Sequence, residues 1–249
     1  MSARVATAIR MGAREQRRRP LLLILLIVLP AYVVSRSIAQ TQATPHRIGL
    51  PGGLQIITSM KDLHGAIMAG IAIAFAAGLC GVFIMQSALA GDRRLVLAGY
   101  RPRETLLARL TILAADTALV TAVALAATAA FFTPAAWIPF AAAAVLLGLI
   151  YGALGALLGA LTDRLAATYL ILFGVMTDLG IVQNPMFGNG TPGKWAVLLP
   201  GYGPMRVMID GAFSPSFHAT GALALSLAWT IALATAVSIL LARALGGTR

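Results

Sequence analysis

The sequence predicts an all-α integral membrane protein with about six transmembrane helices, an N-terminal interfacial helix and short re-entrant helices before the last span. The chain has 249 residues, of which 59% are hydrophobic and only 11% are charged, and its mean hydropathy is +0.87. A soluble domain carries about a quarter charged residues and could not bury this much apolar surface in one core. We therefore expect a single membrane domain over residues 1–249.

Six apolar stretches reach or approach the roughly 20 residues that a spanning helix needs. They cover residues 20–38, 65–90, 106–132, 136–161, 166–183 and 220–242. The first stretch is short and contains Pro30, and the fifth is short and contains Asp178. The other four meet the length requirement fully.

Basic residues predict the orientation, because the cytosolic flanks of spans collect Lys and Arg. Of the 19 basic residues, 14 fall on the side that holds both chain ends, and five fall on the opposite side. The five are Arg36, Arg47, Lys61, Lys194 and Arg206. Both termini are therefore expected in the cytosol. Arginine outnumbers lysine strongly, which is typical of a GC-rich genome and favours a bacterial cytoplasmic membrane. The net charge of +11 lies beside apolar runs, so it fits anionic lipid headgroups rather than nucleic acid.

The segment before the first span, residues 1–19, predicts an amphipathic helix on the inner leaflet. On a helical wheel its arginines and apolar residues fall on opposite sides, with Arg10, Arg14, Arg17 and Arg18 facing away from Val5, Ile9 and Ala13. A disordered basic tail is the alternative interpretation. The run from Leu21 to Val34, followed by Ser37-Ile38-Ala39, also fits a signal peptide, which is a weaker alternative to a retained first span.

Between the second and third spans lies a charged segment, residues 91–105, on the predicted cytosolic side. Gly99 and Arg101-Pro102 are helix breakers. This pattern predicts a short helix, a turn and a new helix start. From the residues alone, the segment is equally a plain loop or a docking surface for a cytosolic partner.

A long segment, residues 184–219, precedes the last span on the predicted outer side and contains five prolines. Its apolar pieces, 195–199 and 205–209, are too short to span. They fit helices that dip into the outer leaflet, provided that protein buries their ends. The run from Gly188 to Trp195 resembles a phosphate-binding loop, but Trp195 replaces the Ser or Thr that holds Mg²⁺, and a preceding strand is lacking. We expect no nucleotide site in this chain.

Small residues form stripes on two of the predicted spans. Gly148, Gly152, Gly155 and Gly159 share one face of the fourth span, and Gly70, Ala74, Gly78 and Gly81 share one face of the second. Such stripes let helices approach closely. Packing within the bundle is the favoured interpretation, and a subunit interface is the alternative.

Few residues of the sequence could take part in catalysis, metal binding or proton transfer. Asp116 and Asp178 lie within spans, where a charge costs about 3 kcal/mol on insertion scales, so we expect them to face the bundle interior or a wet cavity. They could form structural hydrogen bonds, line a substrate cavity or relay protons. The three histidines lack metal-ligand spacing, and Cys80 is the only cysteine. We expect neither a metal site nor nucleophilic catalysis.

The architecture resembles the membrane subunit of type-2 ABC exporters, the ABC-2 permease family, over nearly the whole chain. The resemblance begins with the basic helix running into a proline-bearing first span. It continues in Leu95 to Arg109, which is similar to the family's segment after the second span. It ends in Leu198 to Arg206 with Asp210-Gly211, which is similar to the family's stretch before the last span. The family's usual acidic run after the second span is replaced here by Gly91-Asp92-Arg93-Arg94.

The resemblance implies a permease dimer, with a second copy or a paralogue, docked on two cytosolic ATP-binding subunits that hold the ATP and Mg. The residues implied to couple to the ATPase are Asp92, Arg93, Arg94, Tyr100, Arg101, Arg103 and Glu104. The residues implied to close the exit are Trp195, Pro200, Tyr202, Pro204, Arg206 and Asp210. The implied activity is efflux of amphipathic or lipid-like small molecules, including drugs. The alternatives are a proton-coupled secondary transporter that uses Asp116 and Asp178, and an integral membrane enzyme or assembly factor.

Overall fold

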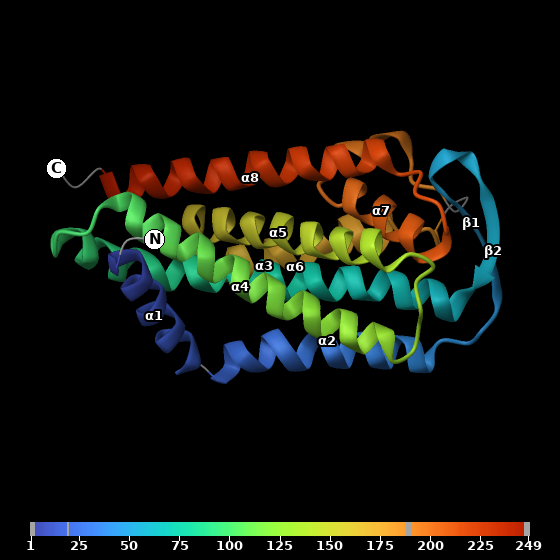
Figure 1. The fold of residues 1–249 in the computed structure, drawn as a ribbon, viewed down its shortest axis with the longest axis horizontal. Coiled ribbons are helices and arrows are strands. Elements are labelled where there is room, and N and C mark those ends of the chain that lie inside the picture. The colour runs from blue at the N-terminus through green and yellow to red at the C-terminus, as the bar shows by residue number, and fades with distance from the viewer. Residues whose placement is uncertain (1–2, 19, 188–190, 247–249) are drawn as a thin grey trace.

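The computed structural model describes residues 3–18, 20–187 and 191–246. Helices run back and forth along one bundle (Figure 1). The elements are α1 (Ala3–Arg17), α2 (Pro20–Gln40), β1 (Pro45–Gly49), η1 (Pro51–Gly53), β2 (Gln55–Ser59), α3 (Met60–Leu97), α4 (Pro102–Ala129), α5 (Trp137–Leu161), α6 (Arg164–Val175), η2 (Met176–Val182), η3 (Lys194–Leu198), α7 (Tyr202–Phe213) and α8 (Thr220–Gly246). Helix α1 and the end of α8 lie at the same end of the bundle as the α3–α4 turn, and we call this the basic end. The opposite end carries β1 and β2 and is called the hairpin end.

Five helices of the described chain are long and apolar enough to cross a membrane. They are Met60–Ser87, Arg103–Ala129, Trp137–Leu161, Arg164–Val182 and Thr220–Ala244. The apolar part of α2 whose side chains the structure describes without a gap, Leu26–Gln40, is shorter. A multi-pass helical membrane protein is therefore confirmed in outline, and the sixth span stays a prediction.

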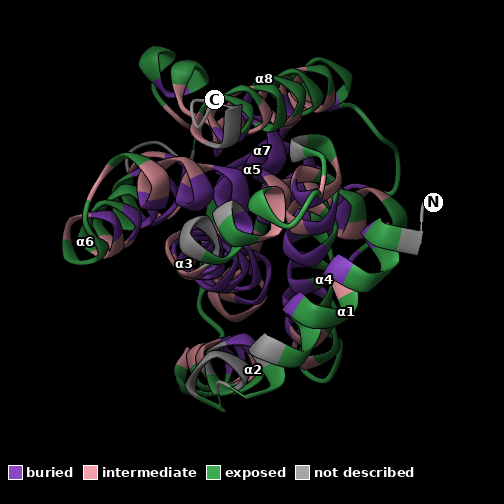
Figure 2. Cartoon of the chain, turned by 90° about the vertical axis from the view of Figure 1, so that its left-hand side faces the viewer, coloured by how far each residue is buried: buried purple, intermediate pink, exposed green. Residues whose placement is uncertain are grey.

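Helices α3 and α5 form the centre of the bundle, and α2, α6 and α8 lie around them with exposed outer faces (Figure 2). The two predicted glycine stripes meet here. A Cβ on Gly155 would collide with the carbonyl oxygen of Gly78, and one on Gly81 would collide with that of Gly152. The stripes therefore serve packing within the chain, because only glycine allows the two backbones to touch.

Helix α1 packs against α4 and α2, and its buried face differs from the prediction. Val5, Ala8 and Gly12 are buried, whereas Ala13 is exposed. The predicted face was therefore partly wrong. The helix turns toward α4 because Gly12 leaves space for the Ile112 side chain, which a Cβ at that position would overlap.

An antiparallel hairpin, β1 with β2, joins α2 to α3 and was not predicted. Its register pairs Pro45 with Ser59 and Ile48 with Ile56. Gly52 and Gly53 have φ of 85° and 81°, a conformation that glycine adopts without strain. The β-branched residues on both sides of this Pro-Gly-Gly turn were the missed signal.

Candidate functional site

At the basic end, α3 continues in helical form past residue 90, the predicted end of the second span, and ends at Leu97, just before the predicted helix breakers. The chain then turns at Gly99, whose φ is 91°, and Arg101 precedes the first residue of α4. The Glu104 carboxylate accepts a hydrogen bond of 3.0 Å from the Arg101 backbone N–H, which fixes the new helix start. The predicted turn and helix start are thus present, while the short separate helix is replaced by an extension of α3.

A buried ion pair holds this extension to α4. Arg109 Nε and Nη2 donate to the Asp92 carboxylate over 2.9 to 3.2 Å, and the Asp92 side chain is only 2% exposed. A two-pronged contact of this kind fixes geometry as well as charge. Asp92 was predicted to contact a partner, but its carboxylate is occupied inside the chain. It positions the turn and presents no docking surface.

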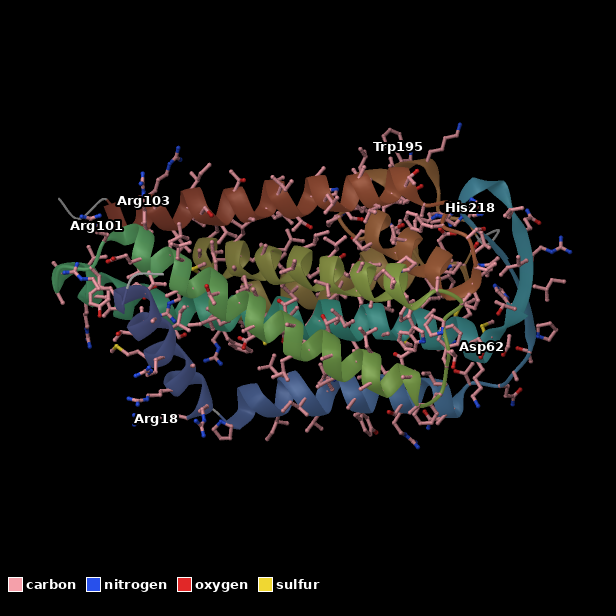
Figure 3. All side chains as sticks on the ribbon, viewed as in Figure 1. Arg18, Asp62, Arg101, Arg103, Trp195 and His218 are labelled. Atoms are coloured by element: carbon pink, nitrogen blue, oxygen red, sulfur yellow. The ribbon has the colours of Figure 1, made fainter. Side chains whose placement is uncertain are left out.

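The predicted basic contacts of the turn lie on its outside. Arg94, Arg101 and Arg103 are exposed, and Figure 3 shows Arg101 and Arg103 pointing away from the bundle. Tyr100 is half-buried because the Arg4 guanidinium lies 6.0 Å from its ring centroid. The side chain of Arg93 lies outside what the structure describes. The turn therefore presents a free cationic surface on a fixed backbone.

An apolar groove of about 580 Å³ runs between α2, α3 and η2 with α6. Its walls include Leu29 from α2, Phe75 from α3 and Met176 from η2. Along α3 the lining extends from His64 to Leu79, which is about 22 Å at 1.5 Å per residue. His64 Nδ1 is buried without a hydrogen-bond partner among the described residues. The groove thus combines a long apolar wall with a polar group near the hairpin end.

Asp178 lies in η2 and joins three elements that are distant in sequence. Tyr151 Oη donates to Asp178 Oδ2 over 2.5 Å, and the Gly201 backbone N–H donates to the same oxygen over 2.9 Å. Gln183 Nε2 donates to Oδ1 over 3.0 Å. The residue was predicted to face the bundle interior, and it does so. Tyr151, Gln183 and Gly201 were missed, because only the fold brings them to Asp178.

Asp116, the other predicted intramembrane carboxylate, is buried on α4. Two further polar side chains of that helix, Thr117 and Thr121, are buried as well, with hydroxyls that lack hydrogen-bond partners in the described part of the chain. A Cβ on Gly148 of α5 would meet both threonines. Asp116 and Asp178 lie on different helices, α4 and η2.

The segment before α8 forms two short helices, η3 and α7, close to the predicted pieces. Ten consecutive residues of α7 are buried, from Gly203 to Ala212. The last carbonyls of α7 are satisfied from the α4–α5 loop, since Ala135 N–H donates to the Ala212 oxygen over 3.0 Å and Ala136 N–H to the Gly211 oxygen over 2.8 Å. The chain thus meets the requirement that protein buries the ends of such a helix.

Arg206 and Asp210 of α7 are both buried and tie the hairpin end together. Arg206 Nη1 donates to the Gly49 carbonyl over 2.9 Å, which anchors β1. Burial lowers the pKa of the Arg206 guanidinium. Asp210 Oδ2 accepts from the backbone N–H groups of His218 and Ala219 over 2.7 and 3.0 Å, which caps the start of α8.

The other predicted exit residues are spread over this end. Pro204 is buried, while Pro200 and Tyr202 are partly exposed. Trp195 is 82% exposed and projects away from the bundle (Figure 3). Three residues of the rejected phosphate-loop motif, 188–190, lie outside the described residues. In the described chain, no three His, Cys, Asp or Glu side chains lie together as metal ligands.

Comparison with known proteins adds no assignment: no protein-family model matches the chain, and no curated protein matches it.

Proposed function

We propose that this chain is the membrane subunit of an ATP-driven exporter of the ABC-2 type and moves amphipathic or lipid-like small molecules. The observation that carries the proposal is the α3–α4 turn. Exposed arginines project from a backbone that the buried Asp92–Arg109 pair holds in place. A rigid cationic surface at one end of a helical bundle suits the transmission of a push from an acidic partner surface.

In this proposal the basic end faces the cytosol and receives the ATP-binding subunit. Helix α1 is tied to the turn, because Arg4 Nη1 donates to the Gly99 carbonyl over 3.1 Å. Its packing on α4 then lets α1 and the turn move together. ATP and Mg belong to the partner, and a second permease copy or a paralogue completes the assembly of twelve spans.

The groove between α2, α3 and α6 is the proposed substrate route. Its length of about 22 Å covers much of the roughly 30 Å hydrocarbon core. A chain-bearing molecule fits the apolar wall, and its polar group would reach His64. The three donors that hold the Asp178 carboxyl group favour a fixed structural role over a proton carrier, so the secondary-transporter alternative has less support.

The double variant Arg101→Glu/Arg103→Glu tests the proposal. Native membranes should yield an ATP-hydrolysing chain that copurifies with the wild-type permease and drives export of a fluorescent amphiphile. Charge reversal should abolish both copurification and ATP-dependent export, while the permease still accumulates and remains monodisperse in detergent. The matched control is Arg47→Glu, a reversal at an exposed arginine of the hairpin end. Undiminished export by the double variant would exclude this docking surface.

A further inference from the structure

The Asp178 network holds a short surface segment, residues 194–202, which we call the flap. Gly201 donates its backbone N–H to Asp178, and Gln183 Nε2 donates both to Asp178 and, over 3.1 Å, to the Ala196 carbonyl. These bonds attach both parts of the flap, η3 and the residues leading into α7, to the end of the fifth span. Tyr151 ties the same carboxylate to α5.

The network depends on the π-helical geometry of η2. The Gln183 backbone N–H donates to the Asp178 carbonyl over 2.8 Å, a bond between residues five apart. In an α-helix, side chains five residues apart differ in direction by about 140°. The wider π turn brings the Gln183 amide and the Asp178 carboxylate onto one side. Single π turns are rare and are often found at functional sites.

The η3 part of the flap has few other buried contacts. Trp195, Val197 and Leu198 are exposed, and Figure 3 shows Trp195 projecting outward. Ala196 is its one fully buried side chain from η3. A segment with few buried contacts opens locally at a low free energy. The hydrogen bonds to Asp178 and Gln183 therefore control whether it stays closed.

A cavity of about 260 Å³ lies beside the network between α5 and α6. Tyr151 and Asp178 line it from the bundle, and Leu199 and Pro200 line it from the flap. Movement of the flap would widen this cavity toward the surface of the hairpin end. The carboxyl group that holds the flap is thus also a wall of the space that the flap borders.

We propose that Asp178 is the positioning residue of a latch: with Tyr151 and Gln183 it keeps the flap closed over this cavity, and breaking the network opens the flap. The inference rests on the proposed function for the meaning of the opening, which is release of substrate at the hairpin end. The control of flap opening by Asp178 is a property of the permease alone and can be tested without an ATPase.

Cysteine labelling of the purified full-length chain in detergent tests the latch. In a Cys80→Ala background, Ala196→Cys places one buried thiol on the inner side of the flap. Asp178→Asn and Tyr151→Phe should raise the rate of maleimide labelling about tenfold, because each weakens a buried hydrogen-bond network that holds the flap. Gly201→Ala should do the same with the carboxyl group intact, since its Cβ would overlap Leu179 Cδ2 and lie 2.8 Å from Asp178 Oδ2.

Two matched controls separate the latch from general loosening. Tyr169→Phe removes a hydroxyl from an exposed tyrosine on α6, and Gly193→Ala adds a methyl group where no atom lies within 4 Å. Both should leave the labelling rate unchanged. If Asp178→Asn fails to accumulate, Tyr151→Phe and Gly201→Ala carry the test.

Equal labelling rates in wild type and latch variants would overturn the latch, and so would equal acceleration by the controls. Because labelling needs no ATPase, the result is distinguishable from a failure of the proposed function. Accelerated labelling without any ATP-dependent export in native membranes would keep the latch and remove the exporter assignment.

Discussion

The two ends of the bundle use polar residues in opposite ways. At the basic end most charges are exposed, and Asp92–Arg109 is the one buried ion pair found in the described chain. At the hairpin end the decisive polar groups, Asp178, Arg206 and Asp210, are buried and bond mainly to backbone groups. The first arrangement leaves a charged surface free to meet another molecule, whereas the second fixes irregular backbone within the same chain. A surface for docking and a device for closure are thus separated along the length of the protein.

The largest effect on the free energy of unfolding is expected at the contact between α3 and α5, the central helices that both ends of the bundle share. Gly155→Ala should lower the free energy of unfolding by about 4 kcal/mol or more and prevent accumulation, because the new Cβ would overlap the Gly78 carbonyl oxygen. Gly174→Ala, at an exposed glycine of α6 with no atom within 4 Å, is the control and should be neutral. Thermal unfolding in detergent measures both. A stable Gly155→Ala protein would contradict the close α3–α5 contact.

At the basic end, the largest loss in the free energy of unfolding is expected when the buried ion pair is removed. Asp92→Ala should cost about 3 kcal/mol, because it leaves the Arg109 guanidinium, 14% exposed, without its carboxylate. The double variant Asp92→Ala/Arg109→Met should recover at least half of this loss. Chemical unfolding of the four proteins gives the coupling free energy. If the two single losses simply add, the pair does not position the turn.

The hairpin end should respond more locally. Arg206→Met removes the hydrogen bond to the Gly49 carbonyl and should cost about 2 kcal/mol. Amide hydrogen exchange should accelerate across residues 45–59 and remain unchanged in the α3–α4 turn. Arg47→Met, on the exposed side of β1, is the matched control. Exchange that rises equally at both ends would contradict the separation of the two regions.

The smallest effects on stability are expected at the exposed side chains. Trp195→Ala and Arg103→Ala should each change the free energy of unfolding by less than about 0.5 kcal/mol. Thermal unfolding checks this directly. The two variants should nevertheless differ in association with a cytosolic partner, which only Arg103→Ala should weaken. A loss of more than about 1 kcal/mol in either variant would mean that the side chain packs against the bundle.

The sequence was most informative where a signal is local. Apolar runs predicted the five helices that are long and apolar enough to cross a membrane. Gly99 and Pro102 predicted the turn, and the glycine stripes predicted close helix packing. Each of these features is set by residues within a few turns of one another. The exposed arginines were predicted in the same way, because the sequence shows which charged residues flank the apolar runs.

The buried polar contacts could not be predicted because they join distant segments. Arg206 contacts Gly49, which lies 157 residues away, and Gly201 contacts Asp178 across 23 residues. The π turn in η2 leaves no periodic signal in so short a stretch. The face of α1 was predicted only in part. The amphipathic pattern placed Val5 correctly, but packing on α4 buries Ala8 and Gly12 rather than Ala13.

In the proposed function, the α3–α4 turn faces the cytosol and meets an ATP-binding subunit. A photoreactive crosslinker attached to Arg101→Cys, in a Cys80→Ala background and in inverted native membrane vesicles, probes this contact. We expect an adduct between the permease and a chain that binds ATP. Labelling of residue 101 by an impermeant reagent from outside intact cells, or an adduct without ATP binding, would contradict it.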